Sequence, residues 1–368
     1  MKFTTTKEKI LTAIQLAERI VGKRESIAVL SSIVLSAEGG VVVRSTNLEA
    51  GIEVHIPSEI TETGMIAINP SVLLQTIRAI SNDTVVLQTE DNNLIVESKN
   101  SRTLIKAVPH DEFPLFSYKN KLDTLDGLQI EREKLVGALQ SVSYATSQSM
   151  IRPELGSVFI TLRDKVITCV ATDSFRLAEK KVIGIKSDEQ KDILLPLKHV
   201  TECIFILEKI KSDIVTLYTD DSQIIIEGDG VFFSSRIIDG TFPNYKDIIP
   251  TNFTTEITTL KSDFIEIMRK ARVFSGTEQT VGLHIYPDKK ICTVTAQSSA
   301  IGEMSDTIDA ALSGEDIDIK FHIGYLTDSL SSIDSDSITL FFSGSGRPMI
   351  MKGVSDTTFM YLVMPLNR

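Results

Sequence analysis

Residues 83–87 read DTVVL, and related segments return at residues 213–217 (DIVTL) and 336–340 (DSITL). Each segment begins with Asp and continues with β-branched and apolar residues, a composition that predicts a strand. A polar turn and a second apolar segment follow each of them: LIVE at residues 94–97, IIIE at residues 224–227 and PMIM at residues 348–351. The chain therefore repeats one β-hairpin three times.

Three helical segments repeat in the same way: KILTAI at residues 9–14, KLVGAL at residues 134–139 and DFIEIM at residues 263–268. Each places its apolar residues on one face of a helix. The copies lie about 125 residues apart, close to a third of the chain, so each is large enough to be a domain. The sequence predicts three copies of one domain, at residues 1–122, 123–250 and 251–368.

The order of elements within a copy can be predicted from the first one. A short strand leads into the amphipathic helix, and strands follow at residues 32–36 and 40–45. A second helix begins at Pro70, because proline suits the first helical turn. Strands outnumber helices, with about two helices per copy. The predicted class is α+β, with antiparallel sheets and the helices packed on one face.

The composition is that of an ordinary globular protein. Hydrophobic residues make up 42% of the 368 residues and charged residues 24%, and the net charge is −11. This charge argues against coating of nucleic acid by bulk attraction, but it leaves room for a local basic surface. Three distant cysteines predict buried thiols in a reducing cytoplasm rather than a disulfide framework. The first residues lack the apolar run of a signal peptide, and no segment has the length of a membrane span.

A search for catalytic or metal-binding patterns finds none. The five histidines have no His or Cys neighbour at ligand spacing, and surface or half-buried positions are expected for them,. The pair Asp220-Asp221 lies at the end of a predicted strand, where turn chemistry is the simpler interpretation. Gly344 and Gly346 flank a predicted hairpin turn rather than a phosphate loop, because no helix follows them. The sequence thus predicts no catalytic residues, no metal and no cofactor.

Basic residues gather on the predicted helices, whereas the hairpin strands hold most of the acidic residues. Lys7, Lys9 and Arg19 belong to the first helix, and Lys261 and Arg272 to its third copy. One interpretation is an ordinary solvated helix face. The other is that helices from all three copies form one basic face that holds phosphates without sequence preference.

Two further segments stand out. Residues 361–366 (YLVMPL) keep the end of the chain apolar, where termini are usually polar,. Residues 171–178 (ATDSFRLA) follow a strand and begin with turn residues. The simple interpretation is a last strand and an ordinary turn. The alternative is a groove in which exposed Leu and Met side chains accept a peptide.

The threefold repeat, the segments at residues 171–178 and 361–366, and FPNY at residues 242–245 together resemble the β sliding clamps of bacterial DNA polymerase III. The resemblance covers the whole chain. It implies a ring of two head-to-tail protomers with helices lining a central hole and sheets outside. Such a ring encircles duplex DNA and confers processivity on the polymerase, so the implied function is that of an accessory subunit without enzymatic or 3′–5′ exonuclease activity.

The resemblance also implies partners and sites. The implied partners are a second copy of the chain, duplex DNA bound without sequence preference, and the polymerase, clamp loader and repair proteins, which dock short linear peptides. The implied peptide pocket comprises Leu155, Thr172, Ser174, Phe175, Arg176, Leu177, Pro243, Ile248, Pro348, Val363, Met364, Pro365 and Leu366. The implied DNA contacts are Arg24, Gln148, Arg152 and Lys198, and the implied dimer contacts are Thr103, Ile105, Val273 and Phe274.

Two other functions are compatible with the residues alone. One is a three-domain binding scaffold that forms no ring, and the other is a hydrolase whose site has no recognisable motif. The mass in solution separates the scaffold from the clamp, because a clamp forms a dimer of twice 40.6 kDa. Turnover of a substrate would reveal the hydrolase.

Overall fold

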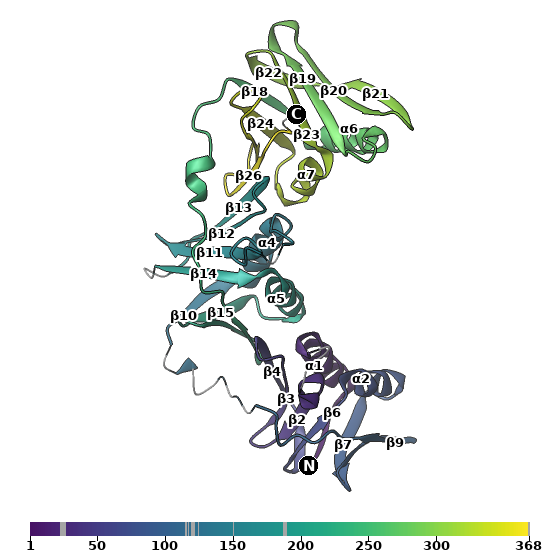
Figure 1. Cartoon of the computed structure of the whole chain (residues 1–368). Coiled ribbons are helices and arrows are strands. Elements are labelled where there is room, and N and C mark those ends of the chain that lie inside the picture. Colours follow the sequence, from purple (N-terminus) through teal and green to yellow (C-terminus); the bar gives the residue numbers. More distant parts are fainter. Residues whose placement is uncertain are drawn as a thin grey trace. The chain divides into compact units, whose positions relative to one another are not determined.

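The computed structural model describes residues 1–22, 27–114, 116, 118, 122–123, 125–149, 151–186 and 190–366. The chain divides into two compact units (Figure 1). Unit 1 contains Met1–Glu133 and Lys198–Ile237, and unit 2 contains Lys134–Leu197 and Ile238–Arg368. The middle copy is thus shared between the units, and the domain boundaries at residues 122 and 250 remain a prediction.

Unit 1 contains two antiparallel sheets. The first has the order β5-β1-β7-β8-β9 and the second β10-β15-β16-β17-β4-β3-β2-β6. Strand bounds are β1 Lys2–Thr6, β2 Ile33–Ala37, β3 Val41–Thr46, β4 Ala50–Ile56, β5 Glu59–Glu62, β6 Met65–Ile68, β7 Thr84–Glu90, β8 Asn93–Ser98, β9 Ser101–Lys106, β10 Gly127–Glu131, β15 Ile214–Thr219, β16 Gln223–Gly228 and β17 Val231–Arg236. The helices are α1 (Lys7–Ile20), α2 (Pro70–Ala79) and α5 (Leu197–Lys209), and α1 packs against α2, β3 and β4.

Unit 2 also contains two antiparallel sheets, in the orders β14-β11-β12-β13-β26-β25-β24-β18-β22 and β21-β20-β19-β23. Strand bounds are β11 Ser157–Arg163, β12 Val166–Thr172, β13 Arg176–Ile183, β14 Lys191–Pro196, β18 Thr255–Leu260, β19 Thr280–Tyr286, β20 Ile291–Ser298, β21 Gly302–Thr307, β22 Ala310–Gly314, β23 Ile317–His322, β24 Ser337–Phe342, β25 Met349–Gly353 and β26 Phe359–Val363. The helices are α4 (Arg132–Ser143), which enters unit 2 at Lys134, α6 (Lys261–Phe274) and α7 (Ile323–Asp328). Short 3₁₀ turns among the described residues of the two units lie at Ala28–Ser31, Tyr245–Ile248, Pro287–Lys289 and Leu330–Ser332.

The repeated hairpins are confirmed. The three segments that begin with Asp form β7, β15 and β24, and each pairs in antiparallel register with the strand that follows it. The helix expected at Pro70 is also confirmed. Pro70 occupies its first turn, and the side chain of Asn69 caps it by accepting a bond from the main-chain N–H of Val72 at 3.2 Å.

A basic residue opens the first helix of every copy and binds main-chain carbonyls near the end of the second helix. Lys7 donates to the carbonyl oxygens of Arg78 and Ile80. Arg132 donates from Nε to Ser212 O at 3.0 Å, and Lys261 donates from Nζ to Ile333 O at 2.7 Å. Arg78 O is one of the carbonyls that the end of α2 leaves without a partner in the helix, whereas Ser212 and Ile333 lie beyond the last residues of α5 and α7,. Lys7 and Lys261, which the sequence offered as phosphate contacts, therefore join the two helices of their own copies.

Replacing Lys261 by Met is expected to lower the free energy of unfolding by about 2 kcal/mol, because Ile333 O loses a charged donor. Arg272→Met, on the exposed face of the same helix, is expected to change it by less than about 0.5 kcal/mol. Thermal unfolding of both variants measures this difference. If Lys261→Met instead leaves stability unchanged and weakens DNA binding, Lys261 is a phosphate contact after all.

The thiols of Cys169, Cys203 and Cys292 are buried, as expected, and burial raises the pKa of Cys169 to about 12.

The expectation that the histidines lie at the surface or are half-buried is wrong at His199, which is 1% exposed. Its Nδ1 lies 2.6 Å from the hydroxyl of Ser235, so a neighbouring strand supplies the polar partner that a buried imidazole needs,. Burial lowers the pKa of His199, which favours the neutral ring,.

Candidate functional site

The turn between β12 and β13 is built from its own polar side chains. Thr172 Oγ1 donates to Arg176 O at 2.7 Å and accepts from the N–H of Ser174 at 3.2 Å. Asp173 Oδ1 accepts from the N–H groups of Phe175 (2.9 Å) and Arg176 (3.0 Å). Ser174 adopts a positive φ of 79°, and Phe175 is left 61% exposed. The turn thus holds an aromatic ring in solvent on a rigid support.

Each nitrogen atom of the Arg176 guanidinium donates a hydrogen bond within the protein. Nε donates to Asp173 Oδ2 at 3.0 Å, Nη1 to Asp328 Oδ2 at 2.6 Å, and Nη2 to Tyr144 O at 2.6 Å. Its Cζ atom also lies 4.5 Å from the centre of the Tyr325 ring. Arg176 therefore links the second and third copies, and these bonds fix the orientation of its guanidinium.

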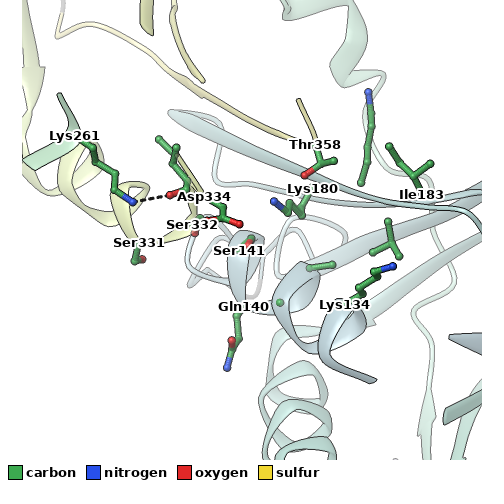
Figure 2. A pocket seen from close by; sticks show the side chains of 15 residues that line it. Lys134, Gln140, Ser141, Lys180, Ile183, Lys261, Ser331, Ser332, Asp334 and Thr358 are labelled. Carbon is green, nitrogen blue, oxygen red and sulfur yellow. Dashed lines mark hydrogen bonds between the residues drawn. The ribbon is translucent and has the colours of Figure 1, made fainter. Parts of the chain in front are cut away.

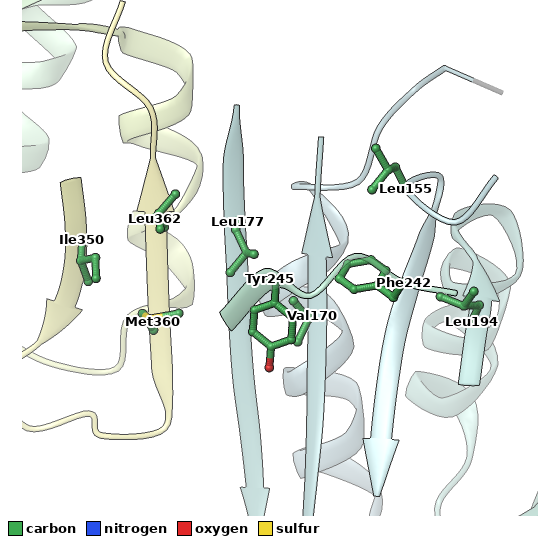
Figure 3. Close-up of a cluster of buried hydrophobic side chains, with 9 residues drawn as sticks. All are labelled: Leu155, Val170, Leu177, Leu194, Phe242, Tyr245, Ile350, Met360 and Leu362. Atoms are coloured by element: carbon green, nitrogen blue, oxygen red, sulfur yellow. The ribbon is translucent and has the colours of Figure 1, made fainter. Parts of the chain in front are cut away.

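An apolar cluster lies beside the turn and spans several strands (Figure 3). Leu177 on β13 and Leu362 on β26 are directly opposite each other, and Leu155 belongs to the same cluster. Phe242 and Tyr245, from the segment that leads to the third copy, also belong to it. Their rings lie 6.2 Å apart in an edge-to-face arrangement. This segment also carries the predicted pocket residues Pro243, half-buried, and Ile248, which is 51% exposed.

The C-terminal residues are tied to this region by main-chain bonds. Val363 pairs with Arg176 across β13 and β26, and with Met349, the residue after Pro348, across β25 and β26. Beyond the strand, Met364 N donates to Phe175 O, and Leu366 N donates to Lys320 O, both at 2.8 Å. Pro365 is buried, whereas the side chain of Leu366 is 41% exposed.

The turn, the cluster and the tail thus bring most of the predicted pocket residues together. Thr172, Phe175 and Arg176 lie in the turn, and Leu155 and Leu177 lie in the cluster beside it. Ser174, Val363, Met364, Pro365, Leu366 and Pro348 are neighbours of these through the bonds and strand pairs described above. We call this set the docking surface. Its role in binding peptides remains a prediction.

The predicted DNA contacts lie at the surface where the structure describes them. Arg24 lies outside the described residues. Gln148 and Arg152 are exposed beside α4, and Arg152 Nε is bound to Glu154 Oε1 at 2.9 Å. Lys198 is exposed in the first turn of α5, in the other unit.

A cavity of about 910 Å³ in unit 2 is lined by lysines and hydroxyl groups (Figure 2). The lysines that line it already have partners within the protein. Lys180 pairs with Asp356 at 3.0 Å, Lys181 pairs with Glu179 at 3.2 Å, and Lys261 binds a main-chain carbonyl. The cavity therefore has little free positive charge for a phosphate.

The Lys180–Asp356 pair predicts a loss of stability in acid. Burial of Asp356 opposes its charged form, but bonds from Thr358 and Lys180 outweigh it and lower the pKa of Asp356 to about 2. A carboxylate with a depressed pKa stabilises the fold above its unfolded pKa of about 4, and this contribution is lost as the pH falls toward 2. We expect Asp356→Asn to be less stable at pH 7 and to lose less on acidification. Unfolding curves from pH 7 to pH 2 test this, and parallel curves for both proteins contradict it.

The predicted dimer contacts belong to two edge strands and their surroundings. Ile105 is buried and Thr103 half-buried on β9, at the edge of its sheet. Val273 is 59% exposed at the end of α6, and the half-buried Phe274 lies close to Gly302, the first residue of β21. β21 is likewise an edge strand.

Neither a metal centre nor a membrane span is found in what the structure describes. No group of three or more His, Cys, Asp or Glu side chains among the described residues could hold a metal ion. No helix in the same part of the chain is long and apolar enough to cross a membrane.

Three family models match almost the whole chain in the order that the repeat predicts. They describe the N-terminal domain of the DNA polymerase III beta subunit at residues 1–117, its central domain at residues 129–244 and its C-terminal domain at residues 246–367. This chain belongs to the DNA polymerase III beta subunit family. The family assignment made from the sequence is confirmed.

Curated relatives and solved structures agree with this assignment. The beta sliding clamp of Bacillus subtilis is 26% identical over 381 residues and covers the whole of both chains. The solved sliding clamp of Bacillus subtilis matches all of this chain and 99% of its own, with 24% identity and a TM-score of 0.94. The Thermotoga maritima beta subunit matches the same shares with 22% identity and a TM-score of 0.92.

The comparisons confirm two predictions. The chain has the three-domain clamp fold with antiparallel sheets, and its relatives are accessory subunits named sliding clamps rather than enzymes. The partners of Arg176, by contrast, were missed. Asp328, Tyr144 and Tyr325 carry no motif, and they come from two copies of the repeat, so no linear spacing relates them.

Proposed function

We propose that this protein is a ring-forming sliding clamp that encircles duplex DNA in the cytoplasm and tethers the replicative polymerase. The observation that carries the proposal is the way in which neighbouring copies join. In unit 1, β17 of the second copy pairs with β4 of the first. In unit 2, β26 of the third copy pairs with β13 of the second. The strand after the repeated hairpin thus joins each copy to the copy before it.

The same pairing between copies leaves one strand at each end of the chain without a neighbouring copy to pair with. The strand after the first hairpin is β9, and the strand of the third copy that corresponds to β4 and β13 is β21. Both are edge strands. An open edge is a template for pairing with another chain. A head-to-tail contact between β9 of one protomer and β21 of another repeats the internal junction. A heterologous contact forms a ring when the rotation between protomers closes, and we expect this one to close with two protomers.

The internal junctions also predict the register of this contact. Val231 pairs with Val54, and Phe359 pairs with Lys180. The residue that corresponds to Val231 and Phe359 is Ser101, because all three begin their strands. Asp306 corresponds to Val54 and Lys180, because the three residues occupy the same place in three equivalent strand triplets. They pair with Val43, Cys169 and Val294, which in turn pair with Leu35, Ile160 and Leu283. Ser101 is therefore expected opposite Asp306 of the partner subunit, and Thr103 opposite Met304 of the partner subunit.

The side chains near these edges support the contact. β9 carries Arg102 and Lys106, whereas β21 carries Glu303 and Asp306, so the side chains of the two strands have opposite charge,. Part of this charge is balanced within the chain, since Arg102 pairs with Glu90 and Glu97, and Asp306 pairs with Lys270. At the first internal junction, Arg19 of α1 pairs with Glu202 of α5 at 2.8 Å. The residue of α6 that corresponds to Arg19, thirteenth from the start of the helix, is the apolar Val273, which is 59% exposed. An apolar residue in place of a member of the ion pair suits an interface that becomes buried.

The decisive test is retention on circular and linear DNA. A ring placed on a closed circle by a clamp loader is expected to stay, and to leave once the circle is cut, because the link is topological. Binding without a loader is expected to be weak and to fall steeply with salt, because it depends on phosphate contacts. Sequence-selective binding that survives high salt contradicts the proposal. A mass of 40.6 kDa in solution favours the scaffold without a ring.

Peptide docking completes the proposed function. The docking surface combines an exposed ring on a rigid turn, an apolar cluster and an apolar tail, which suits a partner that inserts Leu or Phe. Met364 is unbranched and can adapt to different partners. The polymerase, clamp loader and repair proteins are proposed to share this surface.

A further inference from the structure

The turn at the docking surface has a close copy at the first junction. Thr46 Oγ1 donates to Ala50 O at 2.8 Å and accepts from the N–H of Leu48 at 3.0 Å. Asn47 Oδ1 accepts from the N–H groups of Glu49 (3.0 Å) and Ala50 (2.7 Å). Leu48 has a positive φ of 71°. Every one of these features matches the turn at residues 172–176, which lies 126 residues further along the chain.

The surroundings of the two turns match as well. Arg236 N donates to Glu49 O at 2.8 Å, as Met364 N does to Phe175 O. Gly22 N donates to Leu30 O at 3.1 Å, as Ser147 N does to Leu155 O at 2.8 Å. The backbone framework of the docking surface is therefore present twice in the chain.

The side chains on the two frameworks differ at the centre. At the second junction, Leu177 lies opposite Leu362. At the first junction, the corresponding pair is Gly51 opposite Ser234. A Cβ atom on Gly51 would lie 2.5 Å from Tyr118 Oη, so only glycine leaves room for the tyrosine.

Tyr118 fills the space that these two small residues leave. Its side chain comes from the segment that links the first and second copies, is 7% exposed, and lies 2.6 Å from the hydroxyl of Ser234. The centre of its ring lies 5.2 Å from that of Phe116, with the two planes tilted by 47°, and 6.5 Å from that of Phe232, in a stacked arrangement. The ring thus has two aromatic neighbours, and its hydroxyl has Ser234, as those of an aromatic ligand would.

We propose that the first junction is a second docking site for an aromatic side chain, and that the chain's own Tyr118 occupies it permanently. Each chain then offers partners one docking surface although it carries two frameworks. The site without Tyr118 is expected to accept a phenol, because the pocket left behind keeps Ser234 as a hydrogen-bonding group and Phe116 and Phe232 as aromatic neighbours. The assignment of the framework to peptide docking rests on the proposed function.

The first experiment uses small probes and does not depend on peptide docking. Tyr118→Ala is expected to lower the melting temperature by several degrees, and p-cresol to recover part of that loss. Toluene, which lacks the hydroxyl, is expected to recover less. Tyr118→Phe, which keeps the ring, is the matched control and is expected to gain nothing from p-cresol beyond the wild-type response. If Tyr118→Ala does not fold, Tyr118→Val, which keeps part of the packing, replaces it.

Equal p-cresol responses of wild type, Tyr118→Phe and Tyr118→Ala overturn the proposal. A second experiment asks whether the opened site accepts a peptide. In a chain that lacks residues 364–368, Tyr118→Ala is expected to restore one calorimetric binding site per chain for a Tyr-containing peptide. No binding there, with the p-cresol response intact, restricts the site to the chain's own tyrosine and overturns its link with docking. Absence of peptide binding to the wild type instead contradicts the proposed function, whatever the p-cresol result.

Discussion

Deletion of residues 364–368 is expected to abolish the binding of a peptide that carries Gln, Leu and Phe, while the dimer stays intact. Met364 and Leu366 supply apolar side chains beside the turn at residues 172–176, where their main-chain bonds hold them. Apolar anchors of this kind carry most of the energy of such contacts, at about 2 kcal/mol or more each, so the dissociation constant should rise by at least about 100-fold.

Calorimetric titration of the peptide into wild-type and truncated protein measures this effect. Ile183→Ala is the matched control, since Ile183 is a 59% exposed apolar residue at the other end of β13, the strand that carries Arg176 and Leu177. The control is expected to bind with wild-type affinity. Equal affinity of the truncated and wild-type proteins would place the docking site elsewhere.

Arg176 is expected to act differently from the tail. All three of its nitrogen atoms are bound to Asp173, Asp328 and Tyr144. Its removal should therefore weaken peptide binding through disorder of the turn and of the contact between copies, rather than through loss of one bond to the peptide.

The parts of the fold that depend on local pattern were predictable from the sequence. The hairpins that begin at Asp83, Asp213 and Asp336 and the helix at Pro70 follow from strand composition and helix-start chemistry, and the structure has them. The turn at residues 172–176 was recognisable for the same reason, because Thr, Asp and Ser bond to their own backbone.

The parts that depend on packing between distant segments were not predictable. The sequence offered Lys7 and Lys261 as phosphate contacts, and nothing in their spacing indicates that they bind carbonyls more than 70 residues away. His199 gave no sign of burial, because its partner Ser235 lies on another strand. The filling of the first junction by Tyr118 could be recognised only in the structure, because it depends on Gly51 and Ser234 being opposite each other on paired strands.

Replacement of Val273 or Phe274 by Glu is expected to split the dimer. Val273 is 59% exposed in the single chain and Phe274 is half-buried beside β21, so the contact with a second protomer would bury both. An uncompensated carboxylate in such a contact costs about 3–5 kcal/mol, which weakens association by about 100-fold to 1,000-fold or more. Glu303 and Asp306 on the neighbouring strand add repulsion of like charge.

The control for Val273→Glu is the same substitution at an exposed valine elsewhere in the chain. Val354 is 58% exposed and follows β25, which belongs to a different sheet of unit 2 from β21, so Val354→Glu adds the same charge at a valine of almost the same exposure. Light scattering is expected to give the monomer mass of 40.6 kDa for Val273→Glu and twice that mass for Val354→Glu. Because Val273 is exposed in the single chain, its replacement should leave the melting temperature of the monomer unchanged, which separates a lost contact from a lost fold. If Val273→Glu and Phe274→Glu both remain dimeric, protomers do not meet at the end of α6, and the pairing of β9 with β21 falls with that contact.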